Sequence, residues 1–136
     1  MYDHMSRIFI VDDSKIFRFT VVKLFDISGY TGELVEFESG SELIEFLNEN
    51  KHNADVLPNL ILLDINMPHL SGFDTLEELK TLGVPLNNLP VYILSSSIDK
   101  EDVEKAHSFP QVEGFITKPL SPMVVKNLLS SLDLAA

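Results

Sequence analysis

The stretch "LILLDINMP", residues 60–68, places four consecutive aliphatic residues directly before an aspartate, Asp64. A continuous apolar run of this length is typical of a strand buried on both faces, as in a parallel sheet. Pro68 ends the pattern, because proline cannot donate a hydrogen bond to a neighbouring strand. The stretch therefore predicts a central strand that ends on an acid at the edge of a sheet.

The same order of elements, a strand followed by a helix, recurs along the chain. Apolar runs at 7–11, 33–37, 59–64, 90–95 and 112–117 each precede a segment of helical character, at 14–28, 39–50, 72–82, 99–108 and 121–132. In the first of these helices the apolar spacing includes Ile16, Phe19 and Ile27. In the second, Ser39 and Glu42 have the spacing of a capping box.

Strands that alternate with helices predict an α/β fold, because parallel neighbours need crossover helices on the faces of the sheet. We expect a doubly wound, three-layer (βα)5 sandwich around a five-stranded parallel sheet. The runs 8–11, 60–63 and 91–94 would be its central strands, and 33–37, interrupted by Glu33 and Glu36, an edge strand. Because no linker divides the chain, we expect a single domain over 1–136, with an ordered core at about 6–133 and no output domain.

Charge and composition narrow the classes of partner. The 136 residues include 10 Lys and Arg against 21 Asp and Glu, a net charge of −11, and no Cys. An acidic chain is repelled by phosphate backbones and by anionic membranes, so neither nucleic acid nor membrane is an expected partner. The chain has no signal-peptide pattern and no run of about 18 apolar residues. We therefore expect a cytoplasmic protein.

Several polar residues stand at or just after the ends of predicted strands: Asp12, Asp13, Asp64, Ser95 and Lys118. In a doubly wound sheet these ends meet at one edge, where ligands bind. Three close carboxylates repel one another unless a cation lies among them, and Mg²⁺ favours oxygen ligands of this kind. The pattern predicts a Mg²⁺ site with a lysine beside it. Alternatively, Asp12 or Asp13 serves only as a cap for the helix that begins near Ser14.

Four motifs, in this order, carry a resemblance to a known family: "IFIVDDSKIFR", "LILLDINMPHLSGFD", "VYILSSS" and "GFITKPL". With them, nearly the whole chain resembles a response-regulator receiver domain, and its length is similar to that of a stand-alone regulator of a bacterial two-component system. The resemblance implies a flavodoxin-like, CheY-like sheet with strand order 2-1-3-4-5.

The resemblance also implies a role for each residue of the site. Asp64 is the expected phosphoacceptor, and Asp12 and Asp13 are the expected acidic pair. Together with Asp64 and the backbone carbonyl of Asn66, this pair would bind Mg²⁺. Three further positions are expected to read the phosphoryl group: Ser95 as the switch hydroxyl, Lys118 as the phosphate-pairing lysine and Phe115 as the switch aromatic. The peptide bond before Pro119 is expected to be cis.

In this scheme Asp64 accepts a phosphoryl group from the phosphohistidine of a sensor histidine kinase or a histidine phosphotransfer protein. The switched surface over 99–132 then binds a downstream protein target. The domain is not an enzyme, since it catalyses only its own phosphorylation and dephosphorylation. The chain could equally carry a signal or act as a phosphoryl shuttle or sink in a relay, and the sequence leaves both open.

Three other classes of function are disfavoured. An aspartate-nucleophile phosphatase needs an acid two residues after the nucleophile, where this chain has Asn66. A flavodoxin-like cofactor binder needs a neutral phosphate loop after the first strand, where this chain has "DDSK". A pseudo-receiver scaffold that works without phosphorylation is disfavoured because every residue of the acceptor site is present.

Overall fold

The computed structural model describes residues 6–83, 89–97 and 99–135. The expected ordered core, 6–133, includes residues 84–88 and 98, which lie outside the described residues. The strands are β1 (Arg7–Val11), β2 (Glu33–Phe37), β3 (Leu60–Asp64), β4 (Val91–Ser95) and β5 (Val112–Thr117). The helices are α1 (Lys15–Ile27), α2 (Gly40–Asn50), α3 (Gly72–Thr81), α4 (Lys100–Ala106) and α5 (Pro122–Ala135), with a short 3-10 helix at Ala54–Val56.

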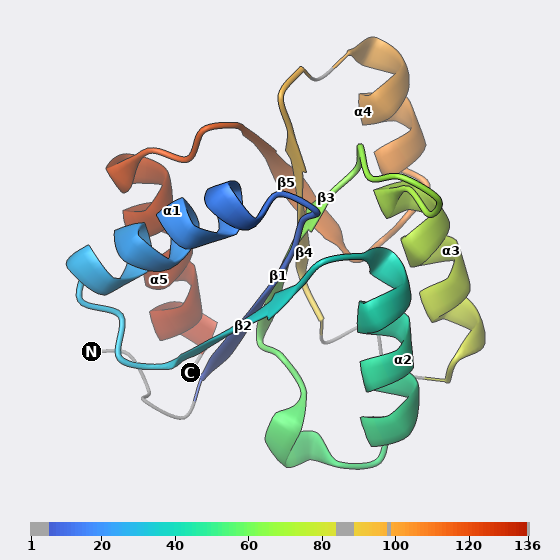
Figure 1. Ribbon diagram of the computed structural model, residues 1–136, viewed down its shortest axis with the longest axis horizontal. Coiled ribbons are helices and arrows are strands. Elements are labelled where there is room, and N and C mark those ends of the chain that lie inside the picture. Colours follow the sequence, from blue (N-terminus) through green and yellow to red (C-terminus); the bar gives the residue numbers. More distant parts are fainter. Residues whose placement is uncertain (1–5, 84–88, 98, 136) are drawn as a thin grey trace.

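The five strands form one parallel sheet in the order β2-β1-β3-β4-β5. Helices α1 and α5 cover one face of the sheet, and α2, α3 and α4 cover the other (Figure 1). The predicted three-layer α/β architecture and strand order are therefore confirmed. So is the position of residues 33–37 at an edge of the sheet, with β1, β3 and β4 in the centre.

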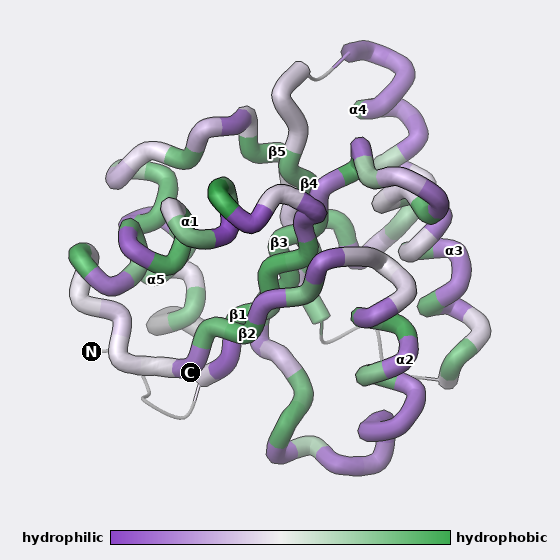
Figure 2. The backbone as a smooth tube through the Cα atoms, viewed as in Figure 1, coloured by the Kyte–Doolittle hydropathy of each residue, from purple (hydrophilic) through white to green (hydrophobic). Residues whose placement is uncertain are grey.

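Alternate residues of the central strands enter two separate hydrophobic cores. Phe9 and Val11 of β1 pack with the α2, α3 and α4 side, whereas Ile8 and Ile10 pack with the α1 and α5 side. All four side chains are fully buried, as are Ile61, Leu62 and Leu63 of β3. Figure 2 shows hydrophobic residues along the strands and hydrophilic ones over much of α2, α3 and α4. Two-sided burial explains why these strands are continuous apolar runs rather than alternating ones.

Side-chain caps begin the helices, but not always as the sequence suggested. Ser14, not Asp12 or Asp13, caps α1, since its hydroxyl oxygen accepts the N–H of Phe17. At α2 the hydroxyl of Ser39 accepts the N–H of Glu42, as the capping-box spacing predicted. The expected return bond is different, because the carboxylate of Glu42 accepts from the N–H of Glu38 rather than from Ser39. The acids after β1 are thus not required for capping.

Helix α1 presents to solvent the apolar residues that gave its helical spacing. Ile16, Phe19 and Ile27 are 79%, 59% and 81% exposed, while the buried positions are Arg18, Val21 and Phe25. The spacing predicted a helix correctly but did not identify its inward face. The reason is that the inward face includes a charged residue, Arg18, whose partners come from other elements of the fold.

The C-terminal ends of the four strands β1, β3, β4 and β5 lie along one edge of the sheet (Figure 1). Asp12 follows β1, Asp64 and Ser95 end β3 and β4, and Lys118 follows β5. Residues far apart in the sequence are thereby brought to one place. Within the described part of the chain, no helix combines the length and the apolar character needed to cross a membrane.

Candidate functional site

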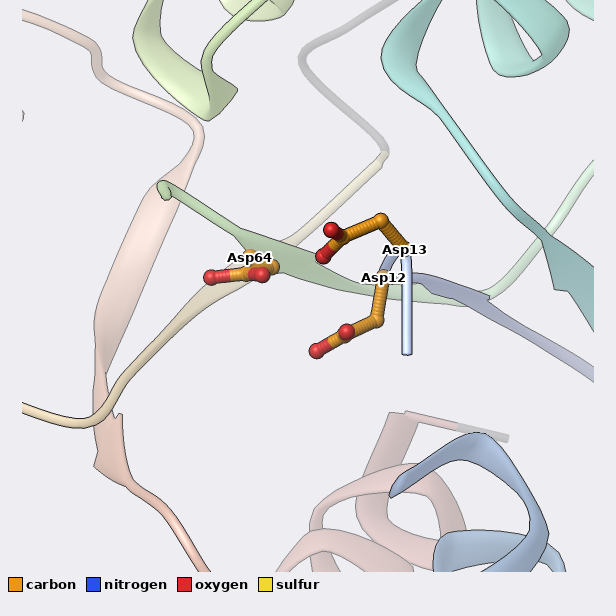
Figure 3. Close-up of side chains that lie close together, drawn as sticks. All are labelled: Asp12, Asp13 and Asp64. Atoms are coloured by element: carbon orange, nitrogen blue, oxygen red, sulfur yellow. The ribbon is translucent and has the colours of Figure 1, made fainter. Parts of the chain in front are cut away.

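Three carboxylates meet at this edge of the sheet. One side-chain oxygen from each of Asp12, Asp13 and Asp64 lies within 4.8 Å of the other two. Asp12 and Asp13 follow the end of β1, beside Asp64 on β3 (Figure 3). Asp12 and Asp64 are buried, at 0% and 2% exposure, whereas Asp13 is exposed. The predicted convergence of the three acids is therefore present in the fold.

Lys118 places its ammonium group between two of these carboxylates. Its Nζ lies 2.6 Å from Oδ2 of Asp12 and 3.2 Å from Oδ2 of Asp64. The same atom lies 4.5 Å from the centroid of the Phe17 ring, a cation–π contact from the first turn of α1. The lysine side chain is 17% exposed. The ammonium therefore supplies local positive charge to a cluster of buried acids.

The pKa shifts agree with a crowded anionic site. Burial raises the pKa of the Asp64 carboxyl, and the charge of Asp12 adds to this, although the N–H of Asn66 and the charge of Lys118 act in the opposite direction. Burial alone would lower the pKa of Lys118, but its contacts with Asp12 and Asp64 outweigh burial, so that the pKa is raised. The ionised form of Asp64 thus needs more positive charge than Lys118 provides.

The donor set of the site fits a divalent cation that prefers oxygen ligands. Oδ2 of Asp12 is buried and accepts no hydrogen bond of normal geometry, although the Lys118 ammonium is close to it. An ionised carboxylate has about four lone-pair sites, so that Asp12 can bind a cation while the ammonium of Lys118 stays beside it. With the oxygens of Asp13 and Asp64, Asp12 forms an acidic triad that could hold a metal ion, and carboxylate oxygens are ligands that Mg²⁺ prefers.

Asn66 connects the acid of β3 to the hydroxyl of β4. Its N–H donates to Oδ1 of Asp64 at 3.0 Å, and its side-chain Nδ2 donates to Oγ of Ser95 at 3.4 Å. Ser95 is fully buried. Its hydroxyl donates to the carbonyl of Ser97 at 2.5 Å and accepts the N–H of Ser97 at 3.2 Å. In this structure the Ser95 hydroxyl is therefore engaged with its own loop.

The remaining predicted residues lie on β5 or just after it. Phe115 is half-buried, stands opposite Ile93 of β4, and packs against the core on the α2, α3 and α4 side. It lies two residues before Thr117, which pairs with Ser95 of β4 at the C-terminal ends of the two strands. The peptide bond between Lys118 and Pro119 is cis. Phe115 is thus near the end of its strand without being one of the clustered charged groups.

Two residues of α1 contribute to the site and were not identified from the sequence. Phe17 places its ring against Lys118, and Arg18 donates from Nη1 to the main-chain oxygen of Asp12 at 2.6 Å. A signal for Arg18 was available, since it stands three residues before Val21 and seven before Phe25, on the same helix face. A charge in line with core residues is a candidate for a buried, partnered group.

Comparison with known proteins agrees with this geometry. Residues 8–130 match the response regulator receiver domain family. The chain is 27% identical over 114 residues to the probable methanogenesis regulatory protein FilR2 of Methanothrix harundinacea, covering 84% of this chain and 72% of that protein. It is 29% identical over 126 residues to the two-component response regulator ORR1 of Oryza sativa subsp. japonica, covering 91% of this chain and 54% of that protein.

A crystal structure of a two-component response regulator from Cytophaga hutchinsonii superimposes with a TM-score of 0.85 at 28% sequence identity, covering 97% of this chain and 99% of that chain. The family match covers most of the chain and includes all the acids of the site. The similarity in fold extends over nearly the same residues. This chain therefore belongs to the response regulator receiver family.

Proposed function

We propose that Asp64 is the phosphoacceptor of this receiver domain and that Asp12, Asp13 and the backbone carbonyl of Asn66 join it in binding Mg²⁺. Receiver domains are signalling phosphoacceptors rather than enzymes, and histidine kinases are their class of partner. One observation carries the proposal: a buried carboxylate at a sheet edge, with two further acids within 4.8 Å and an ammonium group 3.2 Å away.

The chemistry follows from these groups. A carboxylate oxygen of Asp64 forms a bond to the phosphorus of a phosphohistidine while the bond from phosphorus to the imidazole nitrogen breaks. The electron pair of that bond stays on the imidazole, and the product is an acyl phosphate. Bound Mg²⁺ would neutralise charge on the phosphoryl oxygens. Lys118, released from Asp64, pairs with another of these oxygens.

Phosphorylation then changes the contacts of Ser95. The new group adds about −1.5 to −2 charge and strong hydrogen-bond acceptors at the sheet edge. The Ser95 hydroxyl leaves the carbonyl of Ser97 and donates to a phosphoryl oxygen instead. Phe115 moves into the space that this change opens, and the surface over 99–132 binds a downstream protein in that state. The switch is a shift between two arrangements of β4, β5 and the loops that follow them.

The donor protein is expected to dock where α1 and α5 begin. Both helices start at the edge that carries the acids, and both present apolar side chains to solvent near their starts. Ile16 and Phe19 of α1 are 79% and 59% exposed, and Met123 of α5 is 64% exposed. An apolar surface beside an acceptor suits a helical, phosphohistidine-bearing protein. The donor would be a sensor histidine kinase or a histidine phosphotransfer protein.

We further propose that residues 1–136 form one receiver domain. A signal carrier and a phosphoryl shuttle or sink would use the same acceptor chemistry, so that the lifetime of the acyl phosphate and the identity of the target distinguish them. A scaffold that works without phosphorylation is the remaining alternative. It predicts that Asp64 accepts no phosphoryl group from any donor.

The test is the mass of the intact protein after incubation with a small acyl phosphate, with and without Mg²⁺. We expect a single base-labile phosphoryl adduct that requires Mg²⁺ and is absent from Asp64→Asn. Asp55→Asn, at an exposed position in the 3-10 helix, is the matched control and should be labelled like the wild type. Labelling of Asp64→Asn at the wild-type level would overturn the assignment, and no labelling of the wild type would favour the scaffold.

A further inference from the structure

Arg18 is a buried charged residue that the phosphoryl chemistry does not use. Its side chain lies on α1 and the residue is 6% exposed. Nη1 donates to the main-chain oxygen of Asp12 at 2.6 Å, and Nε donates to Oε1 of Glu36 on β2 at 3.0 Å. One planar guanidinium group therefore joins the turn after β1 to the neighbouring strand.

The bond from Arg18 completes a set of contacts that hold Asp12 in place. The N–H of Asp12 donates to the carbonyl of Phe37 at 3.1 Å, which continues the pairing of β1 with β2. Oδ1 of Asp12 accepts the N–H of Ser14 at 2.8 Å. The carbonyl of Asp12 is the third group to be fixed, and Arg18 is the residue that fixes it.

That carbonyl also determines where Asp13 points. The oxygen of Asp12 and the nitrogen of Asp13 belong to one planar peptide group, so that holding the oxygen fixes the orientation of the whole unit. The side chain of Asp13 is exposed, and its direction therefore depends on the backbone to which it is attached. Arg18 thus acts on the relative orientation of the two acids without touching either carboxylate.

We propose that Arg18 is a positioning residue for the cation site: its guanidinium group, oriented by Glu36, holds the peptide between Asp12 and Asp13 so that both carboxylates face Asp64. The inference rests on the proposed function, since it assumes that these acids share a divalent cation. Arginine suits this position because its donors are held in a rigid fork, whereas the ammonium of a lysine is a single point donor.

Arg18 influences Mg²⁺ binding in two ways that are opposite in sign: it positions the peptide between Asp12 and Asp13, and it carries a positive charge of its own. Arg18 is a cation whose donor atom lies 2.6 Å from the backbone of a metal-binding acid, and its charge by itself opposes the binding of a second cation. Removal of the charge alone would therefore tighten Mg²⁺ binding. Loss of positioning would weaken it, and changes to residues that orient metal ligands commonly cost 10- to 100-fold in metal affinity.

The chain offers a matched control. Arg7, the first residue of β1, pairs through Nε with Oε1 of Glu33 on β2 at 2.7 Å, and so makes the same kind of arginine–glutamate pair with β2 as Arg18 does from α1. It lies at the opposite end of β1 from the acids. Arg7→Met removes a comparable arginine–glutamate pair without touching the turn that carries Asp12 and Asp13.

The experiment measures the dissociation constant of Mg²⁺ by titration calorimetry for the wild type, Arg18→Met, Arg18→Lys and Arg7→Met. Urea unfolding curves of the same samples establish that each variant is folded at the titration temperature. We expect Arg18→Met to weaken Mg²⁺ binding about tenfold. Arg18→Lys, which keeps the charge but loses the fork, should weaken it by several-fold, and Arg7→Met should stay within twofold of the wild type.

Mg²⁺ binding by Arg18→Met that is equal to or tighter than the wild type would overturn the inference while leaving the proposed function intact. Equal weakening in Arg7→Met would also overturn it, because the effect would then follow from general loss of stability. If Arg18→Met does not fold, Arg18→Lys decides, with wild-type affinity counting against the inference. A wild-type protein that binds no Mg²⁺ would instead refute the proposed cation site itself.

Discussion

Replacement of Lys118 by methionine tests how much the site depends on its own cation. The change keeps the aliphatic stem and removes an ammonium group that lies 2.6 Å from Asp12 and 3.2 Å from Asp64. At an effective dielectric constant of about 20, the gross attractions are about 6 and 5 kcal/mol. The cost of burying the ammonium offsets much of this, and breaking a buried ion pair usually costs about 3–5 kcal/mol. Because the lysine side chain is 17% exposed, we expect a loss of about 3 kcal/mol in the metal-free protein.

The free energy of unfolding that Lys118→Met loses should depend on pH, and the contacts of Lys118 determine in which direction. Burial raises the pKa of Asp64 above its ordinary value, and the charge of Lys118 offsets part of this increase. Without Lys118 that pKa rises further, so that the folded state takes up a proton at Asp64 more readily than the unfolded state does. Protonation relieves the uncompensated charge as the pH falls. The free energy of unfolding lost in Lys118→Met should therefore be greater at pH 8 than at pH 5.

The measurement is urea unfolding followed by far-ultraviolet circular dichroism, at both pH values and in the presence of EDTA. Lys126→Met is the matched control, because Lys126 is exposed on α5. In thermal unfolding the expected loss corresponds to a decrease of about 10 °C in Tm. Agreement of the two variants within about 0.5 kcal/mol at both pH values, or a greater loss of stability at pH 5, would contradict this account of Lys118.

Three other substitutions test separate parts of the site and its surroundings. Asp64→Asn should stabilise the metal-free protein at pH 7 by about 1 kcal/mol, because burial raises the pKa of this carboxyl and the neutral amide needs no counter-charge. The gain in the free energy of unfolding, measured with urea, should shrink toward pH 4, where the wild-type carboxyl takes up a proton. Gly72→Ala should destabilise the fold by at least about 2 kcal/mol in the same assay, since an added Cβ would lie 2.6 Å from the carbonyl oxygen of Asp64 and 2.8 Å from Cα of Ile65. A variant as stable as the wild type would contradict this packing. Phe19→Ser should slow phosphoryl transfer from a phosphohistidine protein but not from a small acyl phosphate. Ile27 is 81% exposed at the other end of α1, and Ile27→Ser should slow neither reaction. Equal rates for the two variants with the protein donor would argue against docking at the start of α1.

The local patterns of the sequence were sufficient for the architecture. Runs such as 60–63 and 91–94 have to be buried on both faces, and this occurs in parallel sheets whose strands are joined by helices. Glu33 and Glu36 in the run 33–37 indicated an edge strand, which β2 is. Because parallel strands end at a common edge, the acids that follow two of these runs also had to meet there. The strand order itself came from the family resemblance and not from these patterns.

The interior of the site was less predictable, because it depends on contacts between elements. The spacing of Ile16, Phe19 and Ile27 is compatible with either face of α1, and only packing against the sheet determines which face is buried. The carboxylate of Glu42 likewise accepts from the N–H of Glu38 and not from that of Ser39, because the backbone before α2 leaves the N–H of Glu38 within reach. Neither outcome is encoded in the order of apolar and polar residues alone.

Short-range patterns and the geometry of parallel strands were enough to predict the class of fold, the edge that carries the chemistry and the acids that converge on it. Three contacts could be known only from the packed fold: that of Lys118 with both Asp12 and Asp64, that of Asn66 with Ser95, and that of Arg18 with the main chain of Asp12. These contacts join residues on different elements. Their partners are set by where the helices pack on the sheet, and that packing is a property of the whole chain.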